Sequence, residues 1–189
     1  MKKRAIIQYN APTTLTFALL SLVVLGLGAL TKGASTLRYF CVYRSPLTDW
    51  LTYPRFFTHV LGHSSFSHYA GNITLMLVLG PPLEERYGSR MLLWTILATA
   101  FISGLAQWLL FPSTALLGAS GIVFMMILMS SLGGARGRGI PLTLILVFAI
   151  YVGGEIYDAV TARDNVSQLA HIIGGCCGAG FGLWLRKAR

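Results

Sequence analysis

One uncharged stretch decides the fold of this 189-residue chain. Residues 91–135 read MLLWTILATAFISGLAQWLLFPSTALLGASGIVFMMILMSSLGGA, with no charged residue and no histidine. A membrane-spanning helix needs about 20 apolar residues, so the stretch is too long for one span and too short for two comfortable ones. Pro112 and Gly118 interrupt it. Only about a dozen residues, some 20 Å of helix, remain between Gly118 and the glycines at 133–134.

This short helix is expected to begin below the membrane surface. A helix of about 20 Å cannot cross a hydrocarbon core of about 30 Å from one surface to the other. Ser120, in the stretch Gly118-Ala119-Ser120-Gly121, then lies at membrane depth beside irregular backbone. Such backbone is tolerated only where protein or a water-filled cavity covers it. A potential nucleophile in that position therefore favours a functional interpretation.

The composition is that of an integral membrane protein with several spans. The chain is 54% hydrophobic and 11% charged, with a mean hydropathy of +0.66, whereas soluble domains carry about 25% charged residues. We predict an all-α polytopic membrane protein that forms one domain over residues 1–189. The six predicted spans are 12–31, 66–82, 91–110, 120–132, 140–157 and 168–185.

The net charge of +9 follows the predicted topology and argues against nucleic-acid binding. With a cytoplasmic N-terminus, ten basic residues fall inside and five outside, as the positive-inside rule requires. Both termini are then cytoplasmic. The inside residues are Lys2, Lys3, Arg4, Arg86, Arg90, Arg136, Arg138, Arg186, Lys187 and Arg189; the outside ones are Lys32, Arg38, Arg44, Arg55 and Arg163.

The N-terminal region predicts a retained first span and a long external segment. The apolar run after Lys2-Lys3-Arg4 is about 18 residues, longer than the apolar region of a typical signal peptide. The external segment, 32–65, is rich in aromatic residues, which favours a position in the membrane interface. The three cysteines give no disulfide pattern.

Three residues with catalytic chemistry are predicted to meet in one layer. His68 begins the second span, Ser120 the fourth and His171 the sixth. In an alternating topology these three starts lie on the same side of the membrane. Asn72 lies four residues after His68, on the same helix face.

These residues can assemble the machinery of acyl transfer. Serine needs a base to remove its proton, and histidine is the usual base. His68 and Asn72 offer side-chain donors for an oxyanion, and the N–H of Ser120 at a helix N-terminus offers another. Among the acidic residues, only Glu155 and Asp158 come near this layer, so we expect a dyad. Phe124, one turn after Ser120, is placed to orient the imidazole by packing against it.

Other interpretations of these residues are structural. A Gly-x-Ser-Gly stretch is common where membrane helices pack, and without the full Gly-x-Ser-x-Gly elbow an α/β-hydrolase is excluded. Asn72 alone could form a hydrogen bond between helices. Gly174, Gly178 and Gly182 form a small-xxx-small face that lets two membrane helices approach closely.

A metal-dependent enzyme is a further alternative. The four histidines could bind a metal together, but no His-Glu-x-x-His motif is present. We favour hydrogen-bonding roles for His59 and His63, which would tie the external segment to the spans. Glu84 and Arg86 are interpreted as a structural pair in a cytoplasmic turn after Gly80-Pro81-Pro82.

Together the motifs resemble the rhomboid family of intramembrane serine proteases. The resemblance covers nearly the whole chain from Arg55 to Gly182. The five ordered motifs, completed by Gly178, are Arg55-Phe56-Phe57-Thr58-His59 with His63, His68-Tyr69-Ala70-Gly71-Asn72, Glu84-Glu85-Arg86, Gly118-Ala119-Ser120-Gly121 and Ala170-His171-Ile172-Ile173-Gly174.

The resemblance implies a fold, an activity and roles for the site residues. The fold is a six-helix bundle with a short central fourth helix, a water-filled cavity and an external segment lying partly sideways in the membrane. Ser120 is implied as the nucleophile and His171 as the general base. His68 and Asn72, with Gly118 and the Ser120 N–H, are implied to bind the oxyanion and substrate, with Phe124, Gly174 and Gly178 in support.

The resemblance also implies partners. Substrates are single-span membrane proteins, cut near or within the outer end of their span, and no cofactor or metal is needed. The minimal six-span form is more usual in prokaryotes, which implies the inner membrane. A catalytically silent, client-binding relative is the alternative, although such relatives usually lack the serine or the histidine.

Two positions depart from the family pattern. Pro54 precedes Arg55, where tryptophan is frequent, so the local conformation of the external segment is expected to differ. Met125 occupies a position where glycine or alanine is frequent. We expect the glycines of the sixth span to accommodate its bulk.

Overall fold

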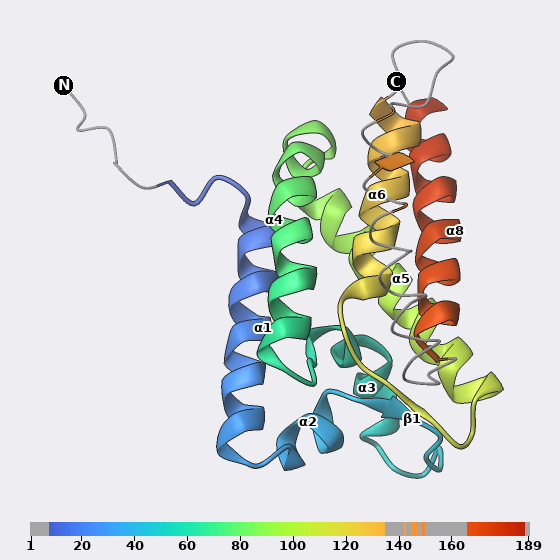
Figure 1. Ribbon diagram of the computed structural model, residues 1–189. Coiled ribbons are helices and arrows are strands. Elements are labelled where there is room, and N and C mark those ends of the chain that lie inside the picture. Colours follow the sequence, from blue (N-terminus) through green and yellow to red (C-terminus); the bar gives the residue numbers. More distant parts are fainter. Residues whose placement is uncertain (1–7, 135–141, 143–144, 147–148, 150–165, 188–189) are drawn as a thin grey trace.

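The computed structural model describes residues 8–134, 142, 145–146, 149 and 166–187, and there the chain is a bundle of helices (Figure 1). Its long helices are α1 (Pro12–Leu30), α4 (Phe66–Tyr87), α5 (Ser89–Leu110), α6 (Ser120–Gly134) and α8 (Val166–Lys187). They coincide with five of the six predicted spans to within a few residues, except at the end of α4. The predicted fifth span, 140–157, lies largely outside the described residues, as do Glu155 and Asp158.

The predicted number of spans is confirmed only in part. Within the described residues, only α1 and α5 are both long and apolar enough to cross a membrane by length and composition. The other candidates are shorter apolar helices, Ser120–Leu132 and Ala170–Leu185. Helix α4 is long enough to cross a membrane but not apolar enough, because histidine, asparagine, prolines and charged residues interrupt its apolar run.

Helix α4 continues further than the sequence predicted. The prediction that this helix ends at Gly80-Pro81-Pro82 is wrong, because α4 continues through both prolines to Tyr87. The reason lies in tertiary packing. Gly80 lies directly against the side chain of Thr14 on α1, and only a glycine fits that approach. Packing against α1 thus keeps the helix going despite the backbone hydrogen bonds that proline removes.

Glu84 joins the far end of α4 to the start of α1. Its carboxylate accepts hydrogen bonds from the backbone N–H of Thr13 (2.8 Å) and of Thr14 (3.0 Å), and from the Thr14 hydroxyl (2.9 Å). These N–H groups belong to the first turn of α1, where no helical partner exists. Glu84 therefore caps the start of a neighbouring helix, and it lies within α4 rather than in the turn that the sequence predicted.

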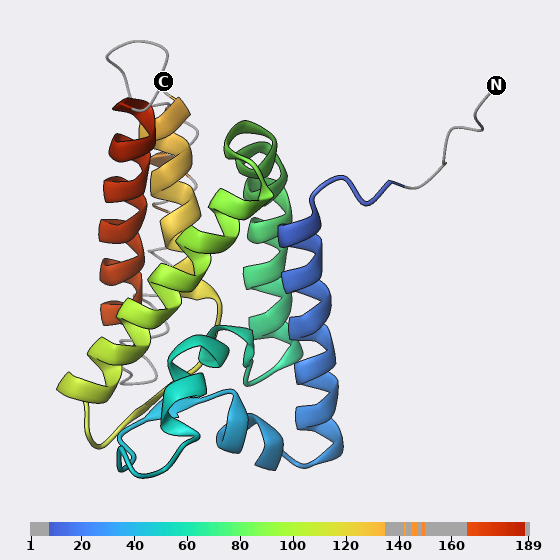
Figure 2. The same cartoon turned by 180° about the vertical axis from the view of Figure 1, so that it is seen from behind.

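Helices α6 and α8 form the most extensive helix pair in the described structure. They lie side by side in both views, and α6 begins part-way along the bundle, further from the α2 end than α4 and α8 do (Figures 1 and 2). Gly174 lies directly against the backbone of Gly121, and Gly178 against that of Met125. Because backbones touch here, Met125 is accommodated as expected, by the absence of a side chain on α8.

The external segment folds into short elements that cover one end of the bundle. These are α2 (Ala34–Tyr39), β1 (Val42–Tyr43), α3 (Thr52–Thr58) and a 3₁₀ turn, η1 (His59–Leu61). Strand β1 pairs antiparallel with β2 (Ala115–Leu116), which lies just before Ser120 in sequence. Pro54 lies in the first turn of α3, where a proline ring is compatible with a helix.

Arg55 holds the external segment together. Its side chain is buried, and its Nε donates to the carbonyl of Arg38 at 2.8 Å. Its Nη1 forms an ion pair with Asp49 at 3.1 Å, and the guanidinium lies over the ring of Tyr43, 4.6 Å from the centroid. One side chain therefore connects α2, β1 and α3.

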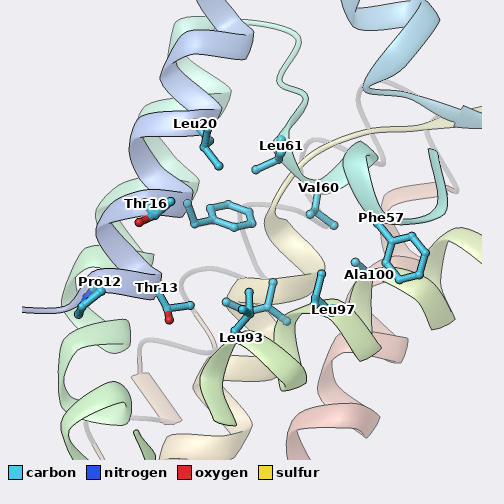
Figure 3. A pocket seen from close by; sticks show the side chains of 12 residues that line it. Pro12, Thr13, Thr16, Leu20, Phe57, Val60, Leu61, Leu93, Leu97 and Ala100 are labelled. Carbon is cyan, nitrogen blue, oxygen red and sulfur yellow. The ribbon is translucent and has the colours of Figure 1, made fainter. Parts of the chain in front are cut away.

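Where α1 and α5 diverge, the external segment fills the space between them. Phe57, Val60 and Leu61 face Leu20 of α1 and Leu97 of α5 across an apolar cavity of about 330 Å³ (Figure 3). Figure 2 shows α5 crossing the bundle diagonally, away from α1. The segment thus lies between two long helices, which fixes its position relative to the rest of the bundle.

Candidate active site

Ser120 is the first residue of α6 and is only 7% exposed. The turn before it contains Gly118 with φ of +123°, a backbone conformation that side chains other than glycine rarely adopt. The chain then enters the helix at once, since Val123 N–H bonds the carbonyl of Ala119. The N–H of Ser120 is one of the first in the helix and has no helical carbonyl to bind.

His171 lies on α8, where that helix meets the start of α6. A side chain on Gly121 would lie 3.1 Å from the carbonyl oxygen of Ala170, so the residues next to Ser120 and His171 touch. The ring of Phe124 stacks on the imidazole of His171, with centroids 4.5 Å apart and planes 15° apart. His171 is 8% exposed. The predicted packing of Phe124 against this imidazole is confirmed.

His68 and Asn72 lie in the first two turns of α4. Asn72 is 2% exposed, and its Nδ2 donates to the carbonyl of His68 at 3.0 Å, within the same helix. Asn72 thus donates along its own helix, one turn after His68.

Gly118 places the serine loop directly beside His68. A side chain on Gly118 would lie 2.8 Å from Cε1 and 2.9 Å from Nε2 of the imidazole. The start of α6, which follows this loop, touches α8 next to His171, because Gly121 lies against Ala170. The structure therefore brings His68, Gly118, Ser120 and His171 into one layer, on three helices and one loop.

The serine loop is anchored to the external segment by backbone bonds. Gly118 N–H donates to the carbonyl of His59 at 3.0 Å, and β2 pairs with β1. His59 is fully buried; its Nδ1 bonds the carbonyl of Arg55 at 3.1 Å, and its Nε2 lies 3.5 Å from the Ser103 hydroxyl on α5. The prediction that His59 ties the external segment to the helices is confirmed.

Sequence reasoning missed two serines that hold His68. Ser64 Oγ lies 3.2 Å from Nδ1 of the imidazole, and Ser65 Oγ accepts the backbone N–H of His68 at 3.1 Å. Ser65 is the N-cap of α4. A serine just before a predicted helix is a capping signal, so Ser65 could have been found. No comparable signal marks Ser64.

The histidines at this end of the bundle do not gather around a common centre. The ring of His63 lies edge-on to those of His68 (5.0 Å) and Tyr69 (5.6 Å). Across the described ranges, no group of three His, Cys, Asp or Glu side chains is placed to hold a metal ion.

The geometry suits acyl transfer. Ser120 at the start of α6 and His171 on α8, whose ring stacks on Phe124, lie on touching helices, and the loop before Ser120 lies beside His68. A buried nucleophile, a base and an oxyanion site are what such a reaction requires. The class defined by fold and site is thus a helical membrane protein with a candidate serine–histidine pair.

Comparison with known sequences agrees with this class. The Rhomboid domain family model matches residues 51–188, so the chain belongs to the rhomboid family. It is an integral membrane protein, as the family and its apolar helices indicate.

Curated relatives include bacterial and animal proteins. The chain is 29% identical to rhomboid protease GlpG of Serratia proteamaculans, over 83% of this chain and 57% of that protein. It is 31% identical to Rhomboid-related protein 2 of Mus musculus, over 68% of this chain and 46% of that protein. It is 28% identical to rhomboid protease GlpG of Pectobacterium atrosepticum, over 75% of this chain and 55% of that protein. The chain spans about half the length of the curated relatives it matches.

Proposed function

We propose that this chain is an intramembrane serine endopeptidase that cleaves single-span membrane proteins near the outer end of their span. The observation that carries the proposal is the meeting of α6 and α8, where Phe124 stacks on His171 and Gly121 touches Ala170. The two relatives named rhomboid protease support a peptidase over a silent client-binding protein.

In the first half of the reaction, Ser120 Oγ attacks the carbonyl carbon of the peptide bond while His171 takes the hydroxyl proton. The carbonyl oxygen becomes an oxyanion, which accepts hydrogen bonds from His68 Nε2–H, from the Asn72 amide and from Ser120 N–H. The C–N bond then breaks, and His171 gives its proton to the leaving amine. An acyl-enzyme on Ser120 remains.

In the second half, water replaces the amine. His171 removes a proton from water, and the resulting hydroxide attacks the ester carbon. The C–Oγ bond breaks, and the proton returns to Ser120. Proton transfer of this kind needs no metal and no cofactor, since the base, the nucleophile and the oxyanion donors are side-chain and backbone groups of this chain.

The test is cleavage of a model single-span substrate by purified protein in vesicles. Ser120→Ala and His171→Ala should each lower kcat by a factor of roughly 10³ or more. Both variants should keep the thermal stability of the parent. A fluorophosphonate probe should label the parent at Ser120 and leave Ser120→Ala unlabelled. Full cleavage by Ser120→Ala would overturn the proposal, and an unlabelled, inactive parent would favour the silent client-binding alternative.

We also propose that the protein lies in a prokaryotic cell membrane with both termini in the cytoplasm. The support is the distribution of basic residues, ten inside and five outside in that orientation. The active-site layer then faces the outer side. Reporter fusions at each terminus should be active only as cytoplasmic reporters; a periplasmic signal from either end would contradict the orientation.

A further inference from the structure

A second cavity, of about 870 Å³, lies between α1, α2 and the loop that leads into α4. One wall is apolar and follows α1 through Leu22, Leu25 and Ala29. The lining also has polar side chains, namely Lys32 after α1, and Ser64 and Ser65 in the loop that leads into α4; we call these three residues the polar end of the cavity. Leu22 is 44% exposed, so the apolar wall opens towards the outside of the bundle, where a membrane helix meets lipid. The cavity therefore combines a basic side chain, that of Lys32, with an apolar wall.

Its cation has no acidic partner among the described residues. Lys32 follows Thr31, the C-cap of α1, and has a φ of +52°, an uncommon conformation for a residue other than glycine. Of the described carboxylates, Asp49 is bound to Arg55, while Glu84 and Glu85 lie at the far end of α4. The external segment, 32–65, has four basic residues and one acidic residue. This end of the cavity therefore favours an anion.

Both serines of the cavity also bond His68. The oxygen of Ser65 already accepts the His68 N–H, so the Ser65 hydroxyl hydrogen can donate to a ligand without breaking that cap. Ser64 Oγ lies 3.2 Å from His68 Nδ1. A ligand at this end would thus contact the loop that positions the imidazole beside Gly118.

We propose that this cavity binds an anionic phospholipid and that the bound lipid raises proteolytic activity. Lys32 and the Ser65 hydroxyl hold the phosphate, and one acyl chain follows Leu22, Leu25 and Ala29. A free phosphate ion could use the polar end but not the apolar wall, so a lipid fits the whole cavity. The lipid orders the loop at Ser64 and Ser65 and thereby keeps His68 in place for the oxyanion.

Binding is measured without any need for activity. Ser120→Ala protein in detergent is mixed with phosphatidylglycerol, and lipid retained on the protein is counted by native mass spectrometry. We expect Lys32→Gln to lose one retained lipid. Arg38→Gln, which removes an equal charge from the same external segment outside the cavity, should retain it. Equal retention by the parent and Lys32→Gln would overturn the proposal.

The effect on activity rests on the proposed function. Cleavage is compared in vesicles of phosphatidylcholine alone and of phosphatidylcholine with phosphatidylglycerol. The anionic lipid should raise parental kcat several-fold, and Lys32→Gln should lose this increase while cleaving normally in phosphatidylcholine. An increase that persists in Lys32→Gln, or one produced by inorganic phosphate alone, would overturn the lipid site. Absence of cleavage in every vesicle would instead contradict the peptidase and leave the binding measurement intact.

A matched pair of variants tests the apolar wall. Leu22→Trp fills part of the cavity, whereas Leu27→Trp places the same bulk on the opposite side of α1. The two leucines are equally exposed, at 44% and 43%. Leu22→Trp should lose the retained lipid and Leu27→Trp should keep it; retention by both would overturn the acyl-chain position.

Discussion

At the scale of single residues, the absence of a side chain is as important as the presence of the serine. Gly118 adopts a positive φ and lies where any Cβ would press on the His68 ring. The two constraints are independent, since one concerns backbone conformation and the other space. Gly118 is therefore a positioning residue for the imidazole.

We predict that Gly118→Ala lowers kcat by a factor of roughly 10² with little change in KM, because a displaced His68 resembles a lost oxyanion donor. The measurement is steady-state cleavage of a single-span substrate. Gly88→Ala is the control: Gly88 has a similarly unusual φ of +85°, but a Cβ added there would meet no neighbouring atom within 4 Å. Equal loss in both variants would indicate general backbone strain.

At the scale of elements, two helix contacts fix the site, and they use opposite chemistry. Helices α6 and α8 meet backbone to backbone at Gly174 and Gly178. Helices α1 and α4 meet through a carboxylate that caps the start of α1. The first contact sets the distance between Ser120 and His171, and the second keeps the far end of α4 in place.

We expect Gly178→Ala to destabilise the protein by about 1–3 kcal/mol, because the new methyl group would press on the Met125 backbone. Thermal unfolding in detergent measures this loss. Gly180→Ala, on the same helix with no atom within 4 Å, should be neutral or slightly stabilising. Comparable melting temperatures for both variants would contradict the packing described for α6 and α8.

Glu84→Ala should cost about 1–3 kcal/mol, because the N–H groups of Thr13 and Thr14 would lose their acceptor. Glu85→Ala removes the same charge from the adjacent, exposed position and should change stability little. Chemical denaturation of both variants provides the comparison. If Glu85→Ala were the more damaging of the two, the capping role of Glu84 would be wrong.

At the scale of the whole molecule, we expect stability to depend on two buried histidines that are neutral in the folded chain. Burial lowers the pKa of His59 to about 4, against the smaller opposing effect of its hydrogen bonds to the backbone. Burial, with a contribution from the charge of His68, also lowers the pKa of His63 to about 4. In the unfolded chain both histidines titrate near pH 6.5. Between about pH 4 and 6.5 the unfolded chain therefore binds more protons than the folded chain.

Stability should therefore be full above about pH 6.5 and fall progressively towards about pH 4. The slope in this window should be smaller for His59→Gln than for the parent, by about 1.4 kcal/mol per pH unit at most. Unfolding curves across the window measure both slopes. Carboxylates that titrate there affect both proteins alike, so an unchanged slope would mean that His59 is not held neutral.

Much of this arrangement follows from the sequence. The uncharged stretch around Ser120 required a short helix, and α6 has 15 residues and begins part-way along the bundle. The layer of His68, Ser120 and His171 followed from counting spans, because topology decides which helix ends meet. The stacking of Phe124 followed from helical spacing alone.

The rest depends on contacts between distant parts of the chain. Pro81 and Pro82 signal a helix end locally, and only the packing of Gly80 on Thr14 explains why α4 continues. The pairing of β1 with β2 joins residues more than 70 positions apart through the backbone, so no side-chain pattern announces it. The partner of Glu84 likewise lies at the far end of the sequence, on α1.

Because β1 pairs with β2 through the backbone, the position of Ser120 does not depend on which side chains lie beside it. Val42 and Tyr43 meet Leu116 and Ala115 through main-chain groups, and Gly118 donates its own N–H to His59. Main-chain bonds survive most changes of side chain. In the peptidase that we propose, the segment leading to Ser120 can therefore change its surface residues to suit different substrates while the serine stays in register. Such a peptidase can alter what it recognises without rebuilding how it cuts.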